Sequence, residues 1–111
     1  MPRPDLSPLT QSILDEVRPL LRKRYGDRLD RLVLYGSQAR GDTHAESDID
    51  VLVVLQGDFD VMAETKALVD IELTCFDRYG VNLHLLPFAA ARYADEGHPL
   101  MMSVHTEGIT L

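Results

Sequence analysis

Apolar residues gather in three short runs that predict the strands of a sheet. Leu32 to Tyr35 is apolar at every position, and Ile49 to Leu55 is apolar except at Asp50. Unbroken runs of this length are typical of strands covered on both faces. The third run, Val81 to Leu86, alternates instead, and Pro87 is expected to end it. One face of that strand would carry Val81, Leu83 and Leu85, and the other Asn82, His84 and Leu86.

The segment before the first strand has the apolar spacing of an amphipathic helix. Ser7 suits the N-cap and Pro8 the first helical position, so we expect a helix from Pro8 to Tyr25 that ends at Gly26. Pro19 lies inside this helix, where it removes a backbone donor, and it predicts either a kink or two shorter helices. The apolar residues at spacings of three and four are Leu9, Ile13, Leu14, Val17, Leu20 and Leu21.

The segment between the second and third strands predicts one long helix from Phe59 to Tyr79, capped by Gly80. A mostly apolar stripe supports this helix. The order strand, helix, strand favours a right-handed crossover within one sheet. Two short helical patterns, at 88–95 and 99–105, precede an apolar tail at 109–111. The stripe consists of Met62, Leu68, Val69, Glu72, Leu73 and Phe76.

Together these patterns predict one α/β (α+β) domain over residues 1–111, with a small mixed sheet and flanking helices. A chain of 111 residues can bury one core but is short for an enzyme with a separate substrate domain. The single cysteine, Cys75, falls within the long helix and is interpreted as a small buried hydrophobe.

Charge and composition narrow the class of protein. The net charge is −7, from 18 acidic and 11 basic residues, which argues against direct binding to nucleic acid. The chain has no apolar run of about 20 residues, so no membrane span is expected. The N-terminus lacks the apolar core of a signal peptide, and a lone cysteine forms no intrachain disulfide, so a cytoplasmic location is expected.

Two carboxylates mark the start of the second strand. Asp48 and Asp50 are two residues apart, so on a strand both side chains point to one face, about 7 Å apart along the backbone. Like charges held this close need a counter-charge. Mg²⁺ or Mn²⁺ is the natural choice, because such ions bind one or two protein carboxylates and complete their coordination with phosphates and water. The pair therefore predicts a metal site that serves a nucleotide.

A turn that could hold phosphate follows the first strand. Gly36 allows close approach of the backbone to a ligand, and a turn of helix after it would aim free N–H groups and the Ser37 hydroxyl at an anion. Arg40, one turn further, could reach a phosphate with its planar guanidinium. We expect these residues to bind the phosphates of a nucleotide.

Taken together, Gly36-Ser37-x-Ala39-Arg40-Gly41-Asp42 and Ser47-Asp48-Ile49-Asp50 resemble the nucleotidyltransferase superfamily of DNA polymerase β, and in particular its minimal nucleotidyltransferase (MNT) members. The resemblance is specific over Leu32 to Leu55 and looser elsewhere. It implies the polymerase-β-like nucleotidyltransferase fold and ATP as substrate with Mg²⁺. It also implies that Gly36, Ser37, Arg40 and Ser47 bind the nucleotide and that Asp48 and Asp50 bind metal.

The third strand departs from the family pattern, which typically has Val-Asp-Leu where this chain has Val81-Asn82-Leu83. Asn82 is thus the match to the third metal-binding carboxylate. An amide oxygen can ligate Mg²⁺, but it brings no charge and cannot accept a proton from an attacking hydroxyl. His84 faces the same way and could act as the base, although an ordinary half-buried strand histidine is an equal alternative.

The resemblance favours transfer of AMP from Mg-ATP to a hydroxyl. Small MNT proteins are commonly antitoxins that modify a tyrosine of a HEPN-type ribonuclease toxin, so such a toxin is the expected partner and acceptor. Two alternatives remain open. One is a catalytically weak antitoxin that acts by binding its partner, which Asn82 supports. The other is an antibiotic-type nucleotidyltransferase subunit that acts on a small molecule.

Overall fold

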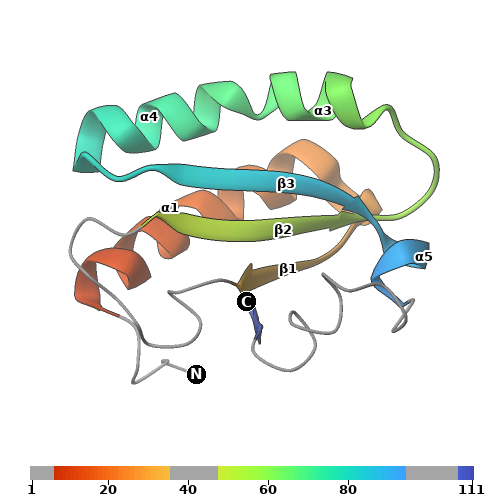
Figure 1. Ribbon diagram of the computed structural model, residues 1–111, viewed down its shortest axis with the longest axis horizontal. Helices are drawn as coiled ribbons and strands as arrows, with labels where there is room; N and C mark the ends of the chain where they lie inside the picture. The colour runs from red at the N-terminus through yellow and green to blue at the C-terminus, as the bar shows by residue number, and fades with distance from the viewer. Residues whose placement is uncertain (1–6, 36–47, 95–107) are drawn as a thin grey trace.

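A four-stranded mixed sheet forms the centre of the structure, in the strand order β3-β2-β1-β4 (Figure 1). The computed structural model describes residues 7–35, 48–94 and 108–111. Strand β1 (Leu29–Tyr35) pairs antiparallel with β2 (Ile49–Leu55), and β2 pairs in parallel with β3 (Leu83–Ala89). A short strand, β4 (Ile109–Thr110), pairs antiparallel with β1. The predicted mixed α/β architecture is confirmed.

The edge strand β3 differs from its predicted range. It begins at Leu83 and continues through Pro87 to Ala89, so the prediction that Pro87 ends the strand is wrong. Proline is tolerated here because, among the described strands, β3 has a neighbour on one side only, and the missing donor lies on the open side. The next outward-facing donor, the Leu85 N–H, is bound by the Glu72 carboxylate at 2.8 Å. The open edge of β3 is thus partly closed to pairing with another strand.

Helix α1 (Pro8–Tyr25) has the predicted bounds. The Ser7 hydroxyl oxygen accepts a hydrogen bond from the Thr10 N–H, and Gly26 ends the helix with a positive φ of 55°. The helix continues across Pro19, so the alternative of two shorter helices is wrong. A 3₁₀ turn, η1 (Gly26–Arg28), then leads into β1.

The long helix predicted between β2 and β3 is two helices, α3 (Val61–Ala67) and α4 (Val69–Tyr79), which meet at Leu68. Asp60 caps α3 by accepting from two backbone N–H groups, and Gly80 ends α4 in the left-handed conformation. The two helices run end to end along β3 (Figure 1). After β3, a short helix α5 (Ala90–Tyr93) occupies part of the predicted 88–95 helix, while the predicted helix at 99–105 lies outside the described residues.

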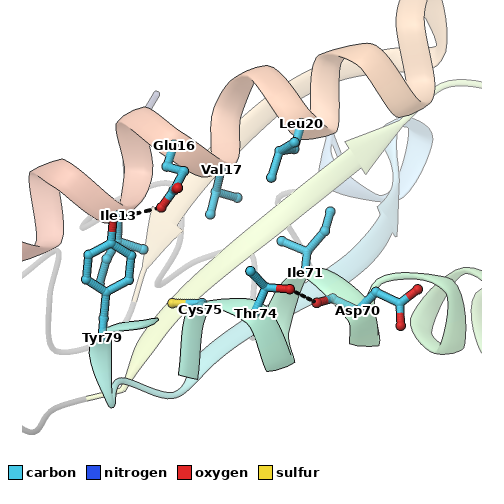
Figure 2. Close-up of a pocket in the computed structure, with 9 residues that line it drawn as sticks. All are labelled: Ile13, Glu16, Val17, Leu20, Asp70, Ile71, Thr74, Cys75 and Tyr79. Carbon is cyan, nitrogen blue, oxygen red and sulfur yellow. Dashed lines mark hydrogen bonds between the residues drawn. The ribbon is translucent and has the colours of Figure 1, made fainter. Parts of the chain in front are cut away.

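Helices α1 and α4 pack side by side, and one acidic residue joins them. The Glu16 carboxylate of α1 accepts a hydrogen bond from the Tyr79 hydroxyl at 2.7 Å (Figure 2). The same carboxylate pairs with the Arg78 guanidinium, and Arg78 and Tyr79 both belong to the last turn of α4. Between the two helices is a cleft with Cys75 on its wall. Cys75 is 4% exposed, as predicted for a buried hydrophobe, and burial, followed by the charge of Glu16, raises the pKa of its thiol.

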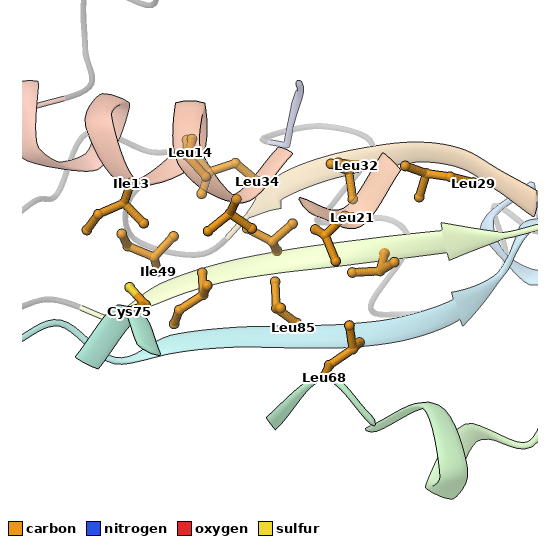
Figure 3. Packing of buried hydrophobic residues seen from close by; sticks show 14 of the residues in the cluster. Ile13, Leu14, Leu21, Leu29, Leu32, Leu34, Ile49, Leu68, Cys75 and Leu85 are labelled. Carbon is orange, nitrogen blue, oxygen red and sulfur yellow. The ribbon is translucent and has the colours of Figure 1, made fainter. Parts of the chain in front are cut away.

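The main core lies between the sheet and the layer formed by α1 and α4 (Figure 3). Alternate residues of β2, from Ile49 to Leu55, face this layer. A smaller cluster on the opposite face of the sheet includes Leu52, Val54 and Phe88, with Tyr93 of α5. Strand β2 is thus buried on both faces, as its unbroken apolar run predicts. The main core comprises Ile13, Leu14, Val17, Leu21, Tyr25, Leu29, Leu32, Leu34, Ile49, Val51, Val53, Leu55, Leu68, Cys75, Val81, Leu83 and Leu85.

The contact between Glu72 and β3 leads to a stability prediction. Glu72→Ala leaves the Leu85 N–H without its carboxylate partner in a part-buried position, so the free energy of unfolding should fall by about 1–3 kcal/mol. Glu72→Gln keeps an acceptor oxygen and should lose less. Urea denaturation followed by circular dichroism measures both. As a control, Asp77→Ala removes an exposed carboxylate from the same helix and should change stability by less than about 0.5 kcal/mol. Equal losses of stability at positions 72 and 77 would contradict a stabilising role for the hydrogen bond between Glu72 and the Leu85 N–H.

Candidate functional site

Three polar residues from three strands form a row on one face of the sheet. In the strand register, Asp50 of β2 lies opposite Tyr35, the last residue of β1, and beside His84 of β3. Side chains alternate along a strand, so Asp50 shares its face with Leu52 and Val54, opposite the face that α1 and α4 cover. The row therefore lies where β1 ends and where β2 and β3 begin.

His84 connects this row to the second predicted carboxylate. Its Nε2 atom is 3.1 Å from an Asp48 carboxylate oxygen, and the two side chains are 54% and 49% exposed. The Ile49 N–H donates to the Asn82 carbonyl at 2.9 Å, which fixes the start of β3 against the start of β2. Asp48 and Asp50 therefore both lie beside His84, which agrees with the prediction that their carboxylates share a face.

The electrostatic environment of Asp50 is unfavourable for a carboxylate. Partial burial is the main cause that raises the pKa of Asp50, and the charge of Asp48 adds to it, while His84 acts in the opposite direction. Burial, followed by the charge of Asp50, also raises the pKa of the Tyr35 hydroxyl. Negative charge at this edge of the sheet is thus only partly compensated by the described side chains around it, and a bound cation would relieve it.

The donor set at this edge fits a hard divalent cation. Asp48 and Asp50 supply carboxylate oxygens, and Mg²⁺ commonly binds one or two carboxylates together with substrate phosphates and water. In the described parts of the chain, no group of three or more His, Cys, Asp and Glu side chains is arranged to hold a metal ion. The protein ligands seen here would therefore need a bound nucleotide or water to complete a metal site.

The structure brings together some of the sequence-predicted site residues and does not describe others. Asp48, Asp50 and His84 meet, and Asn82 lies one residue before β3 with an exposed side chain. Asn82 contacts β2 through its backbone carbonyl. The predicted nucleotide-binding residues Gly36, Ser37, Arg40 and Ser47 lie outside the described residues.

Sequence reasoning missed Tyr35 as part of this arrangement. The sequence pattern assigns Tyr35 to an apolar strand, yet it lies in the row with Asp50, and the charge of Asp50 contributes to the raised pKa of its hydroxyl. The sequence contained a signal for it, because Tyr35 directly precedes Gly36-Ser37, where the sequence predicts a phosphate-binding turn, and side chains alternate between the two faces of a strand.

Two clefts formed by described residues lie away from the row. One, of about 150 Å³, lies between α1 and α4 on the covered side of the sheet and is mostly apolar (Figure 2). The other, of about 280 Å³, lies at the far end of β3 beside Phe59, Phe88 and Arg92. Neither contains Asp48 or Asp50, so neither is a candidate for the metal-dependent chemistry. Within the described ranges, no helix is long and apolar enough to span a bilayer.

Comparison with curated proteins finds relatives of one kind. Two proteins of Methanocaldococcus jannaschii, both named "putative protein adenylyltransferase", match this chain. MJ0604 is 38% identical over 68 residues, which is 60% of each chain. MJ1305 is 36% identical over 76 residues, which is 68% of this chain and 52% of the relative. The present chain therefore spans between about half and three fifths of the length of these relatives.

Comparison with solved structures finds the same fold. A toxin–antitoxin complex with AMP-PNP contains a chain that superposes with a TM-score of 0.58 at 22% identity, covering 86% of this chain and 70% of that one. A complex of the tri-AMPylated Shewanella oneidensis HEPN toxin with its MNT antitoxin gives a TM-score of 0.54 at 19% identity, covering 90% and 69%. At these identities the likeness establishes the fold. The model of the nucleotidyltransferase domain family matches residues 14–92, which include all of β1, β2 and β3, and the chain therefore belongs to the nucleotidyltransferase domain family.

Proposed function

We propose that this chain transfers AMP from Mg-ATP to the hydroxyl group of a tyrosine in a partner protein. The observation that carries the proposal is the meeting of Asp48, Asp50 and His84 at the edge where β1 ends. Family membership supplies the class of reaction, nucleotidyl transfer. The names of the curated relatives favour a protein as acceptor.

In the proposed reaction, the acceptor hydroxyl oxygen attacks the α-phosphorus of ATP. A new P–O bond forms, the bond to the β-phosphate oxygen breaks, and pyrophosphate leaves. Asp48 and Asp50 would hold Mg²⁺ (or Mn²⁺), which when bound neutralises phosphate charge. The segment after Tyr35 carries Gly36, Ser37, Arg40 and Ser47, which we assign to binding the triphosphate on the basis of the family motif.

His84 is suited to accept the proton that the hydroxyl loses. An ionised carboxylate can only accept a hydrogen bond, so the contact with Asp48 makes Nε2 of His84 the donor. In the neutral ring, Nδ1 is then the free acceptor, and Asp48 fixes the orientation of the imidazole. We therefore propose His84 as the general base. We assign Asn82 only the role of an additional oxygen ligand to the metal ion.

We infer that the partner is a HEPN-type toxin and that the chain serves as its antitoxin. The supporting observation is that chains of this fold occur in toxin–antitoxin complexes, one of them with an AMPylated HEPN toxin. A second candidate function is neutralisation by binding alone. It is favoured by one observation, that Asn82 stands where the family pattern has its third metal-binding carboxylate.

The test of AMP transfer uses labelled ATP, Mg²⁺ and the protein encoded by the adjacent reading frame. Label should appear on the partner, and Asp48→Asn or Asp50→Asn should reduce the rate by at least about 10²-fold, because the metal loses a charged ligand. Asp58→Asn, an exposed carboxylate beyond the other end of β2, is the matched control and should transfer at the wild-type rate. A complex that forms without any transfer of label would favour neutralisation by binding alone.

The roles of His84 and Asn82 are separated by two further variants. His84→Ala should lower the rate of AMP transfer by about 10²- to 10⁴-fold. Asn82→Asp should raise the rate, since it adds a charged ligand one residue before β3. Single-turnover rates between pH 5.5 and 8.5 measure both. An unchanged rate and pH profile in His84→Ala would remove His84 from the proposed mechanism.

The environment of Asp50 predicts a pH-dependent effect on stability without metal. The pKa of Asp50 is raised in the folded protein, so its ionisation costs stability as pH rises from the unfolded-state pKa through the folded one. In EDTA, Asp50→Asn should therefore melt at a higher temperature than wild type at pH 7, and the difference should shrink toward pH 4. Thermal melts at both pH values test this. A variant that is less stable at pH 7 would mean that Asp50 is stabilised by its surroundings.

A further inference from the structure

The outer side of α3 and α4 carries a row of exposed apolar side chains. Met62, Val69, Leu73 and Phe76 are 65%, 38%, 62% and 53% exposed. All four belong to the stripe that the sequence pattern assigns to one amphipathic helix, but of that stripe only Leu68 is part of the core. The helices are anchored instead through Leu68 and Cys75, with Ile71 and Tyr79 packed against the core.

The exposed row has the spacing of a coiled-coil seam. With Lys66 included, its members are separated by four, three, four and three residues, which is the alternation of a and d positions in a heptad repeat. Helices α3 and α4 run end to end, so the row continues across their junction for about four turns, or roughly 21 Å (Figure 1). We call this the α3–α4 seam, and its members are Met62, Lys66, Val69, Leu73 and Phe76.

Acidic residues flank the seam at the positions that select a coiled-coil partner. In the same heptad register, Asp70 and Asp77 occupy e positions, whereas Glu72, at a g position, is bound to the Leu85 N–H of β3. Asp70 and Asp77 are exposed. Over residues 58–77 the chain has six acidic side chains and a single lysine, Lys66, which lies in the seam itself. The apolar row is therefore bordered by negative charge.

We propose that the α3–α4 seam binds an amphipathic helix of a partner protein, one with apolar a and d positions and lysine or arginine at e and g. The charge pattern selects this occupant. A second copy of the chain would bring the same acidic flanks into contact, and like charges at e and g oppose pairing. Nucleic acid would meet the same negative charge. Added strands are disfavoured at the adjacent edge of β3, where Glu72 and Pro87 limit pairing.

Lys66 adds a specificity requirement. A charged residue at one a position of a seam sets the register, because it must meet a polar or acidic residue on the facing helix. The partner helix should therefore carry glutamate, aspartate or a polar residue opposite Lys66. The seam lies on the other side of the sheet from Asp50 and is distinct from the site of AMP transfer, so this proposal does not rest on the proposed function.

The test uses synthetic peptides and the intact chain. A basic peptide of about four heptads has leucine at a and d, lysine at e and g, and one glutamate at the a or d position that faces Lys66. Its twin has glutamate at e and g. The lysines and the buried glutamate limit self-association of the basic peptide. Fluorescence anisotropy of labelled peptide, at low and high salt, measures binding.

We expect the chain to bind the basic peptide at least tenfold more tightly than the acidic twin, with affinity that falls as salt rises. Leu73→Asp should weaken binding by at least about tenfold, because it places a charge in the seam. Leu9→Asp, an exposed apolar position on α1, is the control and should bind as wild type does. Circular dichroism checks that both variants remain folded.

Reversing the charge of the flanking residues tests whether that charge determines which peptide binds. Asp70→Lys with Asp77→Lys should shift the preference toward the acidic peptide, because only the e positions change sign. Three results would overturn the proposal: no binding of either peptide, equal binding of both, or self-association of the wild-type chain that Leu73→Asp abolishes. The last of these would assign the seam to a second copy of the chain.

Discussion

The pairing of β2 on both its edges is the constraint on which the rest of the structure depends. Residues Val51 to Leu55 are 0–1% exposed, so this strand is covered above and below as well as held from both sides. Its register with β1 and β3 determines that Tyr35 and His84 lie beside Asp50 at the start of β2. A slip of one residue on either edge would send Asp50 to the helix-covered face and bury it among leucines. The position of the carboxylates is therefore inseparable from the packing of the core.

Much of this arrangement could be predicted because its signals are local. The unbroken run from Ile49 to Leu55 predicted the central strand with its observed bounds, and Ser7, Pro8 and Gly26 predicted those of α1. The alternation of strand side chains placed Asp48 and Asp50 on one face, and β3 has His84 on that face too. Each of these inferences needs only a period of two or 3.6 residues and the chemistry of a cap.

The predictions that failed depend on partners distant in sequence. Pro87 ends a strand only where its N–H would be needed, and whether β3 is an edge is decided by the order of the whole sheet. Strand β4 is too short to show a period and exists because it pairs with β1. The long helix predicted over 59–79 divides at Leu68, whose side chain is fully buried in the core.

The seam runs along β3 on the other side of the sheet from the row of site residues, and its Phe76 end lies at the end of the sheet that carries the row. Helix α4 ends at Tyr79, Gly80 turns the chain, and β3 begins at Leu83, so Phe76 at one end of the seam is eight residues from His84. Figure 1 shows the end of α4 above the start of β3. A helix bound along the seam would not itself enter the site. On the two proposals taken together, the next segment of the same partner would pass the edge of β3 to bring a hydroxyl to Asp50, and binding along the seam would raise the local concentration of that hydroxyl.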